Sequence, residues 1–369
     1  MDLATWTQRR GLLALAFVMA GAILIAACGG DDNAQSTTPT PAPVSVTFMA
    51  GFKPQADLPF VGAYVAKDKG FFAAEGLNVD IQHVTTPGDN FPLLASGTVQ
   101  FSTADAGEVL NHRAGDPSLP LVSVALIGQT GQQGFAVLAN SGIQTPADWV
   151  GKTAGYKGDT VAPDYLAILA ANHINRSSIS EVRTGYDPQV LTQGQVDIYP
   201  VFLANEPDTL SRLGYPTKLF TAADDGAPTL GLTYVATQDY VQQNPDVVRR
   251  FVKAALQGIA YADQHRDEAI DIVLKYAPEA DRAHQRYMLD TELAMAKTAA
   301  AQSGGIGYQT REQWQALHDY LVQYGAIPHA ITDISSVFTD DFIPPVTSPT
   351  ATPASQSSTP ASPSATASP

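Results

Sequence analysis

The chain has 369 residues, of which 44% are hydrophobic and 15% are charged, and its formal net charge is -15. This apolar share is enough for a buried core and excludes wholesale disorder. The acidic balance argues against a nucleic-acid-binding protein, because such a chain repels phosphate backbones. Cys28 is the only cysteine, which excludes an internal disulfide, an iron–sulfur cluster and a cysteine-based zinc site.

The first residues have the pattern of an export signal. Arg9 and Arg10 precede an uncharged apolar run over residues 11–27, which is about as long as the hydrophobic part of a signal peptide. The run ends in LIAAC, and small residues directly before Cys28 are typical of lipoprotein signals. We therefore predict a signal peptide over 1–27, lipidation of Cys28 and a lipid anchor that holds the chain on the extracytoplasmic face of the cell membrane. A plain membrane anchor is the alternative, and the sequence leaves export by Sec or by Tat open.

Polar segments rich in proline flank the predicted folded body. We interpret residues 28–43 as a flexible tether. In residues 344–369, Ser, Thr and Pro supply 19 of the 26 positions and no charge occurs. Such a segment cannot bury enough area to offset the entropy of ordering it, so we predict a disordered tail that serves as a spacer or a glycosylation stalk.

Strand-like and helix-like segments alternate from residue 44 onward. The expected strands are 44–50, 77–84, 99–102 and 121–127. The expected helices between them are 59–69, 89–96 and 105–114. Strands separated by helices predict a parallel α/β sheet.

The alternation restarts after residue 127 and ends near residue 236. The expected strands of this half are 135–140, 152–156, 181–184, 196–201, 217–220 and 230–236. The rest is mostly helical, with a start signal at Asn244, an apolar stripe at helical spacing that includes Phe251 and Ile259, and a capping box of Thr310 and Gln313. We predict an α/β protein with two lobes and two crossover connections, in which lobe I holds 44–127 and 236–343 and lobe II holds 128–235. Clefts between lobes are where small ligands bind.

Common catalytic motifs are absent from the sequence. The histidines show no metal-ligand spacing such as HExxH, and neither GxSxG nor a Walker A motif occurs. Gly128, Gly131 and Gly134 have the spacing GxxGxxG instead of the GxGxxG of dinucleotide sites, so we expect a crossover loop there. We predict a protein without catalytic residues, metal or cofactor. An exported enzyme on the same scaffold and a purely structural surface protein are the alternatives.

Four segments resemble, in order, motifs of the solute-binding lipoproteins of ABC importers. They are YVAKDKGFF with EGL at 64–77, GI with DWVGK at 142–152, GQVD at 194–197 and NPDVVRRF at 244–251. On these motifs the chain is identified as a member of the family that binds nitrate, alkanesulfonates and thiamine pyrimidine precursors. The resemblance implies a two-lobed periplasmic-binding-protein fold of type II, with ABC permease and ATPase subunits as partners.

Two features bear on which ligand the resemblance implies. Asn205 and Glu206 resemble a pair on the second lobe of the thiamine-pyrimidine relatives. Those relatives also carry W-x-P-N-x-x-H after the first strand, but here Phe60 stands where the histidine is expected. The fungal pyrimidine synthases of this fold need cysteines that this chain lacks. The lipoprotein signal, tether, tail and first-lobe sequence most resemble riboflavin-binding lipoproteins, which implies riboflavin as the transported ligand and a pyrimidine precursor or another flat neutral heterocycle as the alternative.

Loops after the strands of both lobes supply the candidate binding residues. They are Gln55, Asp57, Phe60, Tyr64, Asp89, Asn90, Gln129, Gln132, Tyr156, Asp159, Tyr186, Tyr199, Asn205 and Glu206. The same loops also hold Lys53, Phe91, Asp105, Glu108, Gln133 and Lys157. Without arginine, this aromatic and amide-rich set suits a flat neutral heterocycle better than an anion. A place in the core is the other interpretation of Tyr64 and Tyr199.

Overall fold

The computed structural model describes residues 42–158 and 161–345. The predicted signal peptide, Cys28, Asp159 and most of the predicted tether and tail lie outside these residues, so the predictions made for them stay predictions. No helix in the described ranges is long and apolar enough to cross a membrane.

One sheet of five strands organises the first lobe. Its strands are β1 (Val44–Ala50), β2 (Leu77–His83), β3 (Phe101–Asp105), β4 (Leu121–Leu126) and β10 (Leu232–Thr237), in the order β2-β1-β3-β10-β4. β1 runs parallel to β2 and β3, whereas β10 runs antiparallel to β3 and β4. The expectation of a parallel sheet is therefore wrong for β10. The reason is that β10 returns from the second lobe and so enters the sheet from the edge at which β3 and β4 end.

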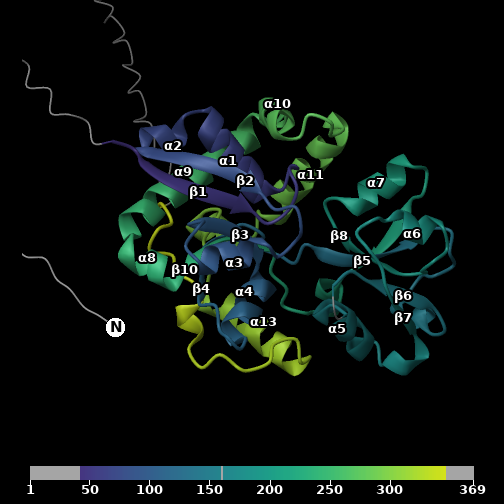
Figure 1. Cartoon of the computed structure of the whole chain (residues 1–369). Coiled ribbons are helices and arrows are strands. Elements are labelled where there is room, and N and C mark those ends of the chain that lie inside the picture. Colours follow the sequence, from purple (N-terminus) through teal and green to yellow (C-terminus); the bar gives the residue numbers. More distant parts are fainter. Residues whose placement is uncertain (1–41, 159–160, 346–369) are drawn as a thin grey trace, which may run out of the picture. The chain divides into compact units, whose positions relative to one another are not determined.

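The second lobe is built on shorter strands. β5 (Gln133–Leu138) pairs antiparallel with β8 (Tyr199–Phe202) and β9 (Thr217–Phe220), and β6 (Thr153–Tyr156) pairs parallel with β7 (Ser180–Arg183). Its α-helices are α5 (Pro163–Ala171), α6 (Gln189–Thr192) and α7 (Glu206–Arg212), which Figure 1 shows grouped around these strands. Short 3-10 helices occupy Pro146–Trp149, Arg176–Ser178 and Ala222–Asp225.

Helices cover the first sheet, and the C-terminal part of the chain supplies most of them. The helices of the first lobe's N-terminal part are α1 (Leu58–Asp68), α2 (Phe71–Ala74), α3 (Asn90–Ala95) and α4 (Ala106–Ala114). The later ones are α8 (Gln238–Gln243), α9 (Pro245–Gln264), α10 (Arg266–Tyr276), α11 (Arg282–Met295), α12 (Ala299–Gly304), α13 (Arg311–Gln323) and the 3-10 turn Ile334–Ser336. The apolar stripe predicted on α9, which includes Phe251 and Ile259, is buried against the core, and the Thr310–Gln313 capping box forms.

Two chain connections link the lobes and lie against each other. One follows β4 and the other precedes β10, and they are joined by hydrogen bonds from Gly128 N to Leu232 O (2.7 Å) and from Gly231 N to Gly128 O (2.8 Å). A Cβ atom at Gly131 would lie 2.2 Å from Thr229 Oγ1, so the crossover needs glycine there. The glycine-rich segment is thus a crossover loop followed by a strand, as predicted. The chain returns to the first sheet before Leu232, whereas the sequence placed that boundary at 236.

Candidate functional site

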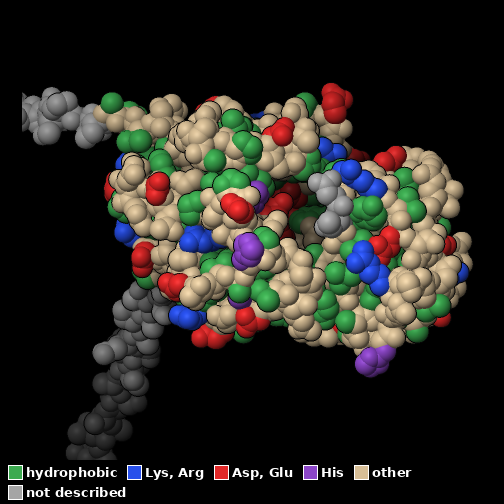
Figure 2. Space-filling view, turned by 60° about the horizontal axis from the view of Figure 1, so that its bottom comes forward, with side chains coloured by type: hydrophobic (Ala, Val, Ile, Leu, Met, Phe, Trp, Pro, Cys, Tyr) green, Lys and Arg blue, Asp and Glu red, His purple; other side chains and the backbone are tan. Residues whose placement is uncertain are grey.

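A pocket of about 210 Å³ lies between the two lobes. The first lobe lines it with Gly51, Phe52, Gln55, Asp57, Phe60, Pro87, Gly88, Asn90, Phe91, Thr103, Ala104, Asp105, Glu108 and Leu232. The second lobe contributes Gln133, Lys157, Tyr186, Phe202, Asn205 and Glu206. Figure 2 shows the hollow between the lobes from one face, with acidic side chains at its edge. Most lining residues follow the ends of β1 and β3 or lie in loops of the second lobe, which is where ligands of α/β sheets bind.

Half of the predicted binding residues meet in this pocket. They are Gln55, Asp57, Phe60, Asn90, Tyr186, Asn205 and Glu206. They come from both lobes and from segments up to 151 residues apart in sequence. The rule that binding residues follow the ends of strands (the strand-end rule) therefore selected side chains that are distant along the chain but line one pocket. Direct contact of each with a ligand stays a prediction.

Two of the predicted binding residues, Tyr64 and Tyr199, lie in the core of their lobes instead of the pocket. Tyr64 is fully buried in the first lobe, where its ring stacks on Tyr276 at 3.9 Å and its hydroxyl lies 2.7 Å from Nε2 of His83. Tyr199 is also fully buried, and its hydroxyl donates to the carbonyl of Gly185 at 3.0 Å. Both side chains support their lobes and neither lines the pocket.

Four further candidates of the described chain also lie outside the pocket lining. Gln129 donates to the carbonyls of Leu126 and Tyr308, and Oε1 of Gln132 accepts from the backbone of Leu232, so both amides brace the crossover. Asp89 precedes α3 on the surface, and Tyr156 ends β6.

Other lining residues were not among the predicted binding residues. The predicted loops hold Phe91, Asp105, Glu108, Gln133 and Lys157, which were not predicted to bind the ligand. Gly51, Phe52, Pro87, Gly88, Thr103, Ala104, Phe202 and Leu232 were missed altogether. Gly51 and Phe52 follow β1 directly, and Thr103 belongs to the end of β3, so a consistent use of the strand-end rule would have included them.

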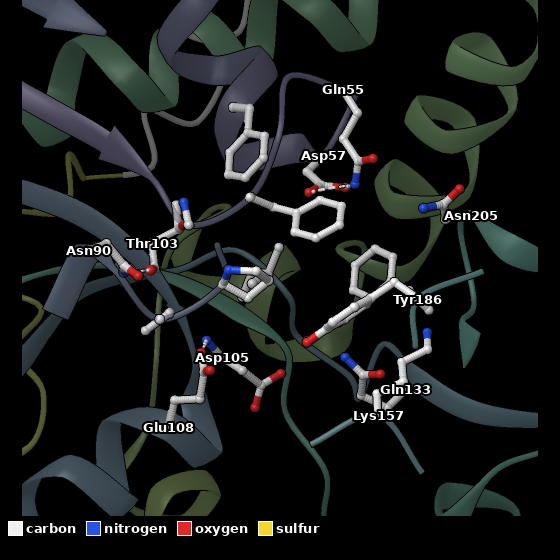
Figure 3. Close-up of a pocket in the computed structure, with 18 of the residues that line it drawn as sticks. Gln55, Asp57, Asn90, Thr103, Asp105, Glu108, Gln133, Lys157, Tyr186 and Asn205 are labelled. Carbon is white, nitrogen blue, oxygen red and sulfur yellow. Dashed lines mark hydrogen bonds between the residues drawn. The ribbon is translucent and has the colours of Figure 1, made fainter. Parts of the chain in front are cut away.

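Two aromatic rings face each other across the lobes. Phe52 of the first lobe and Tyr186 of the second have ring centroids 6.1 Å apart and an interplanar angle of 47°. Tyr186 is 51% exposed, and Nζ of Lys157 lies 5.6 Å from the centre of its ring. Figure 3 shows Tyr186 projecting into the pocket from the second-lobe side. A flat ligand in the pocket can therefore stack on an aromatic face.

A buried carboxyl pair closes one end of the pocket. Nε2 of Gln55 donates to both carboxylate oxygens of Asp57, at 3.0 and 3.1 Å, and Glu292 of α11 lies behind Asp57. Burial raises the pKa of Asp57 to about 6. Burial and, next, the neighbouring charge of Asp57 raise the pKa of Glu292 well above its ordinary value. The pair therefore retains a proton to a higher pH than two separate carboxyl groups would.

The single ammonium group among the described lining residues is already paired. Lys157 forms an ion pair with Glu206, whose other oxygen accepts from the backbone N–H of Phe202 at 2.7 Å. Four carboxyl groups, those of Asp57, Asp105, Glu108 and Glu206, line the pocket against this one cation. The described residues include no group of three or more His, Cys, Asp or Glu side chains that could hold a metal ion. The electrostatics thus suit hydrogen-bond donors and disfavour anions.

Side-chain contacts join the lobes on both sides of the pocket. The ring of His284 on α11 lies between Asp208 and Asn205 of the second lobe, with Nδ1 2.7 Å from Asp208 Oδ2 and Nε2 3.0 Å from Asn205 Oδ1. On the other side, the hydroxyl of Tyr320 donates to Asp164 at 3.1 Å. Since Asn205 also lines the pocket, the His284 contact links lobe position directly to the binding surface.

Two curated proteins resemble the chain over nearly its whole length. The formylaminopyrimidine-binding protein of Halalkalibacterium halodurans is 28% identical over 333 residues, which cover 86% of this chain and 96% of the relative. The riboflavin-binding protein RibY of Chloroflexus aurantiacus is 28% identical over 343 residues, which cover 87% and 95%.

The fold is shared with solved periplasmic proteins. The aliphatic sulphonate binding protein SsuA of Escherichia coli matches with a TM-score of 0.60 at 15% identity, over 80% of this chain and 92% of that one. The chain thus has the predicted two-lobed periplasmic-binding-protein fold. A family model described as NMT1/THI5 like matches residues 58–269, which is more than half of the chain. The chain belongs to the NMT1/THI5-like family.

Proposed function

We propose that the chain is the solute-binding component of an ABC importer. It captures a flat nitrogen heterocycle between its lobes and delivers it, unchanged, to a transmembrane permease that works with an ATPase subunit. The observation that carries this proposal is the pocket between the lobes, which combines an aromatic side chain from each lobe with four carboxyl groups and one paired cation. The two relatives named as binding proteins support it. The chain would act on the extracytoplasmic face, held by lipid on Cys28.

A thiamine-type aminopyrimidine is the ligand that the pocket geometry favours first. The cavity of about 210 Å³ is smaller than the roughly 300–1,000 Å³ of typical ligand sites. A single ring fits a space of this size and can stack on the exposed ring of Tyr186, and an exocyclic amino group can donate to carboxylates such as Asp57 and Glu206. The sequence ranked the pyrimidine after riboflavin, because Phe60 stands where a histidine is expected. The size of the cavity and its carboxylates outweigh that absence. The relative named for formylaminopyrimidine is in keeping with this choice.

Riboflavin is the second candidate, and a different observation favours it. The pocket presents amide groups from both lobes, those of Gln55, Asn90, Gln133 and Asn205, which can hydrogen-bond the imide edge of a flavin and its ribityl hydroxyls. The hollow opens to the surface, so a ribityl chain can extend from it (Figure 2). The relative named for riboflavin is as similar as the one named for the pyrimidine.

One experiment separates these ligands. The purified full chain is titrated with formylaminopyrimidine by calorimetry and with riboflavin by fluorescence quenching. We expect saturable, sub-micromolar binding of one of them and at least about a hundredfold weaker binding of the other. Mass spectrometry of the ligand after incubation should find it chemically unchanged, whereas a released product would favour an enzyme. Absence of binding of both at tens of micromolar would overturn the proposal.

The ring of Tyr186 is expected to contribute directly to affinity. Replacement of Tyr186 by alanine removes the second-lobe aromatic face, and stacking together with the lost apolar area should weaken binding about tenfold. Tyr215→Ala is the matched control, because Tyr215 is an exposed tyrosine of the same lobe that does not line the pocket. Equal dissociation constants for Tyr186→Ala and Tyr215→Ala in calorimetry would show that the ligand does not stack there.

The interlobe contact of His284 should also affect affinity. His284→Ala removes both contacts to α7, so the closed arrangement loses stabilisation and the apparent affinity should fall about tenfold. The control is Arg286→Gln on the same helix, because Arg286 pairs with Asp267 and Asp290 within the first lobe. Calorimetry with the ligand identified above measures both variants. Unchanged affinity of His284→Ala would mean that this contact does not support closure.

A further inference from the structure

The N-terminus of α4 faces the pocket, but its own side chains occupy it. Asp105 ends β3 and caps the helix, since its Oδ1 accepts from the backbone N–H of Gly107 at 2.9 Å. Oε2 of Glu108 accepts in turn from the backbone N–H of Asp105 at 2.9 Å, and the N–H of Ala106 donates to Gly231 O. Helix N-termini commonly bind anions through such N–H groups. Here two carboxylates already satisfy them, so no anion site remains.

The same two residues present unused acceptors to the cavity. The capping box uses two of the roughly four acceptor positions of the Asp105 carboxylate and one of those of Glu108, and both side chains line the pocket. Glu108 is exposed at its surface, yet the protein around its carboxyl group raises its pKa. Burial and, next, the charge of Glu108 raise the pKa of Asp105 to about 7. Asp164, Tyr186 and Lys157 are the titratable groups that face this pair from the second lobe.

Asn90 adds a third acceptor with a fixed orientation. It is 99% buried, and its Nδ2 donates to Ser102 Oγ at 2.9 Å and to the carbonyl of Thr103 at 3.1 Å. The carbonyl of Thr103 can only accept, so the amide nitrogen of Asn90 must face it. Oδ1 of Asn90 is therefore left without a partner among the described residues on the pocket wall. Figure 3 shows Asn90, Asp105 and Glu108 on the first-lobe side, away from the end formed by Gln55 and Asp57.

We propose that Asn90, Asp105 and Glu108 form an acceptor-rich subsite of the pocket, which binds a hydroxyl or amine substituent of the ligand and excludes its phosphorylated form. This inference rests on the proposed function and adds to it the class of substituent that the pocket accepts. A hydroxyl supplies one donor to these acceptors, and an amine supplies two or three. A phosphate would place like charges against Asp105 and Glu108, and the one described lining cation, Lys157, is already paired with Glu206.

The test compares each neutral compound with its phosphate. The full chain is titrated with 4-amino-5-hydroxymethyl-2-methylpyrimidine and its phosphate, and with riboflavin and its 5′-phosphate. We expect the wild type to prefer the neutral member by about a hundredfold or more. Asp105→Asn combined with Glu108→Gln keeps the shape and the helix cap but removes the charges, and should narrow that preference at least about tenfold. Glu108→Gln alone should reduce the preference for the neutral compound by a smaller factor. Asp333→Asn changes a helix cap away from the pocket and should leave the preference unchanged.

A second readout distinguishes binding from a structural role. Donation by the ligand stabilises the ionised carboxylates, so binding near pH 7 should release a proton, which calorimetry in buffers of different ionisation enthalpy detects. The double variant should lose this release. An unchanged preference in the double variant, or a wild type that binds the phosphate as tightly as the neutral compound, would overturn the subsite. Binding of neither pair to the wild type, and of formylaminopyrimidine neither, would instead overturn the proposed function, and the subsite with it.

Discussion

Replacement of Gly258 by alanine is expected to lower the free energy of unfolding by about 3 kcal/mol, at the upper end of overpacking effects. Gly258 lies on α9 where that helix meets α1. A Cβ atom there would lie 2.0 Å from the carbonyl oxygen of Gly62 and 3.0 Å from the backbone nitrogen of Ala66. Both obstacles are backbone atoms, so the added methyl group can only be accommodated if the two helices move apart and the core between them loosens.

The sign of this effect makes it diagnostic. Helix propensity alone predicts that alanine in place of a mid-helix glycine stabilises by about 1 kcal/mol. Urea unfolding followed by circular dichroism measures the difference. Gly185→Ala is the matched control, because no heavy atom lies within 4 Å of a Cβ built at that loop position, and it should leave stability within about 0.5 kcal/mol. A Gly258→Ala variant at least as stable as the wild type would contradict the close approach of α1 and α9.

Local patterns in the sequence predicted the parts of the fold that depend on local physics. The apolar stripe of α9 repeats with helical spacing, and the Thr310–Gln313 box satisfies backbone groups within one turn, so both can be derived from neighbouring residues. The strand-end rule needs only the predicted ends of the strands, and it located Gln55, Asp57 and Asn90 in the pocket. The direction of β10 could not be derived in this way, because it depends on how the chain returns from the other lobe.

The residues that sequence reasoning misplaced are those whose partners come from distant segments. Tyrosine is a residue type expected in a pocket for a flat ligand, but contacts with Tyr276 and His83 hold Tyr64 in the core. Conversely, His284 and Glu292 carry no motif, yet α11 brings them against Asn205 and Asp57, the latter more than 230 residues away in sequence. Nothing in the local pattern of α11 indicates these contacts. The electrostatics of the pocket are therefore set by tertiary packing that the sequence does not display.

The most consequential of these distant contacts is the carboxyl pair of Asp57 and Glu292. Asp57 is 4% exposed and Glu292 is 2% exposed, and Glu292 Oε2 accepts from the backbone N–H of Leu58 at 2.8 Å. Burial raises the pKa of Asp57 from 3.8 to about 6. Between these values the folded state binds more protons than the unfolded state, so the free energy of unfolding falls as the pH rises.

Glu292→Gln is therefore expected to stabilise the ligand-free chain above pH 6, by about 1–3 kcal/mol, and to change little at pH 4. A glutamine can keep the Leu58 contact through its oxygen and present an N–H group to Asp57, which replaces a like-charge pair by a hydrogen bond. Urea unfolding at pH 4, 6 and 7.5 measures the profile, with the exposed Glu312→Gln as control. The free energy of unfolding of the variant should still fall somewhat as the pH rises, because burial also raises the pKa of Asp105 to about 7 and that of Asp164 to about 6. Parallel profiles of the wild type and Glu292→Gln would show that the two carboxyl groups do not share a proton, and the pH dependence would then come from Asp57, Asp105 and Asp164 separately.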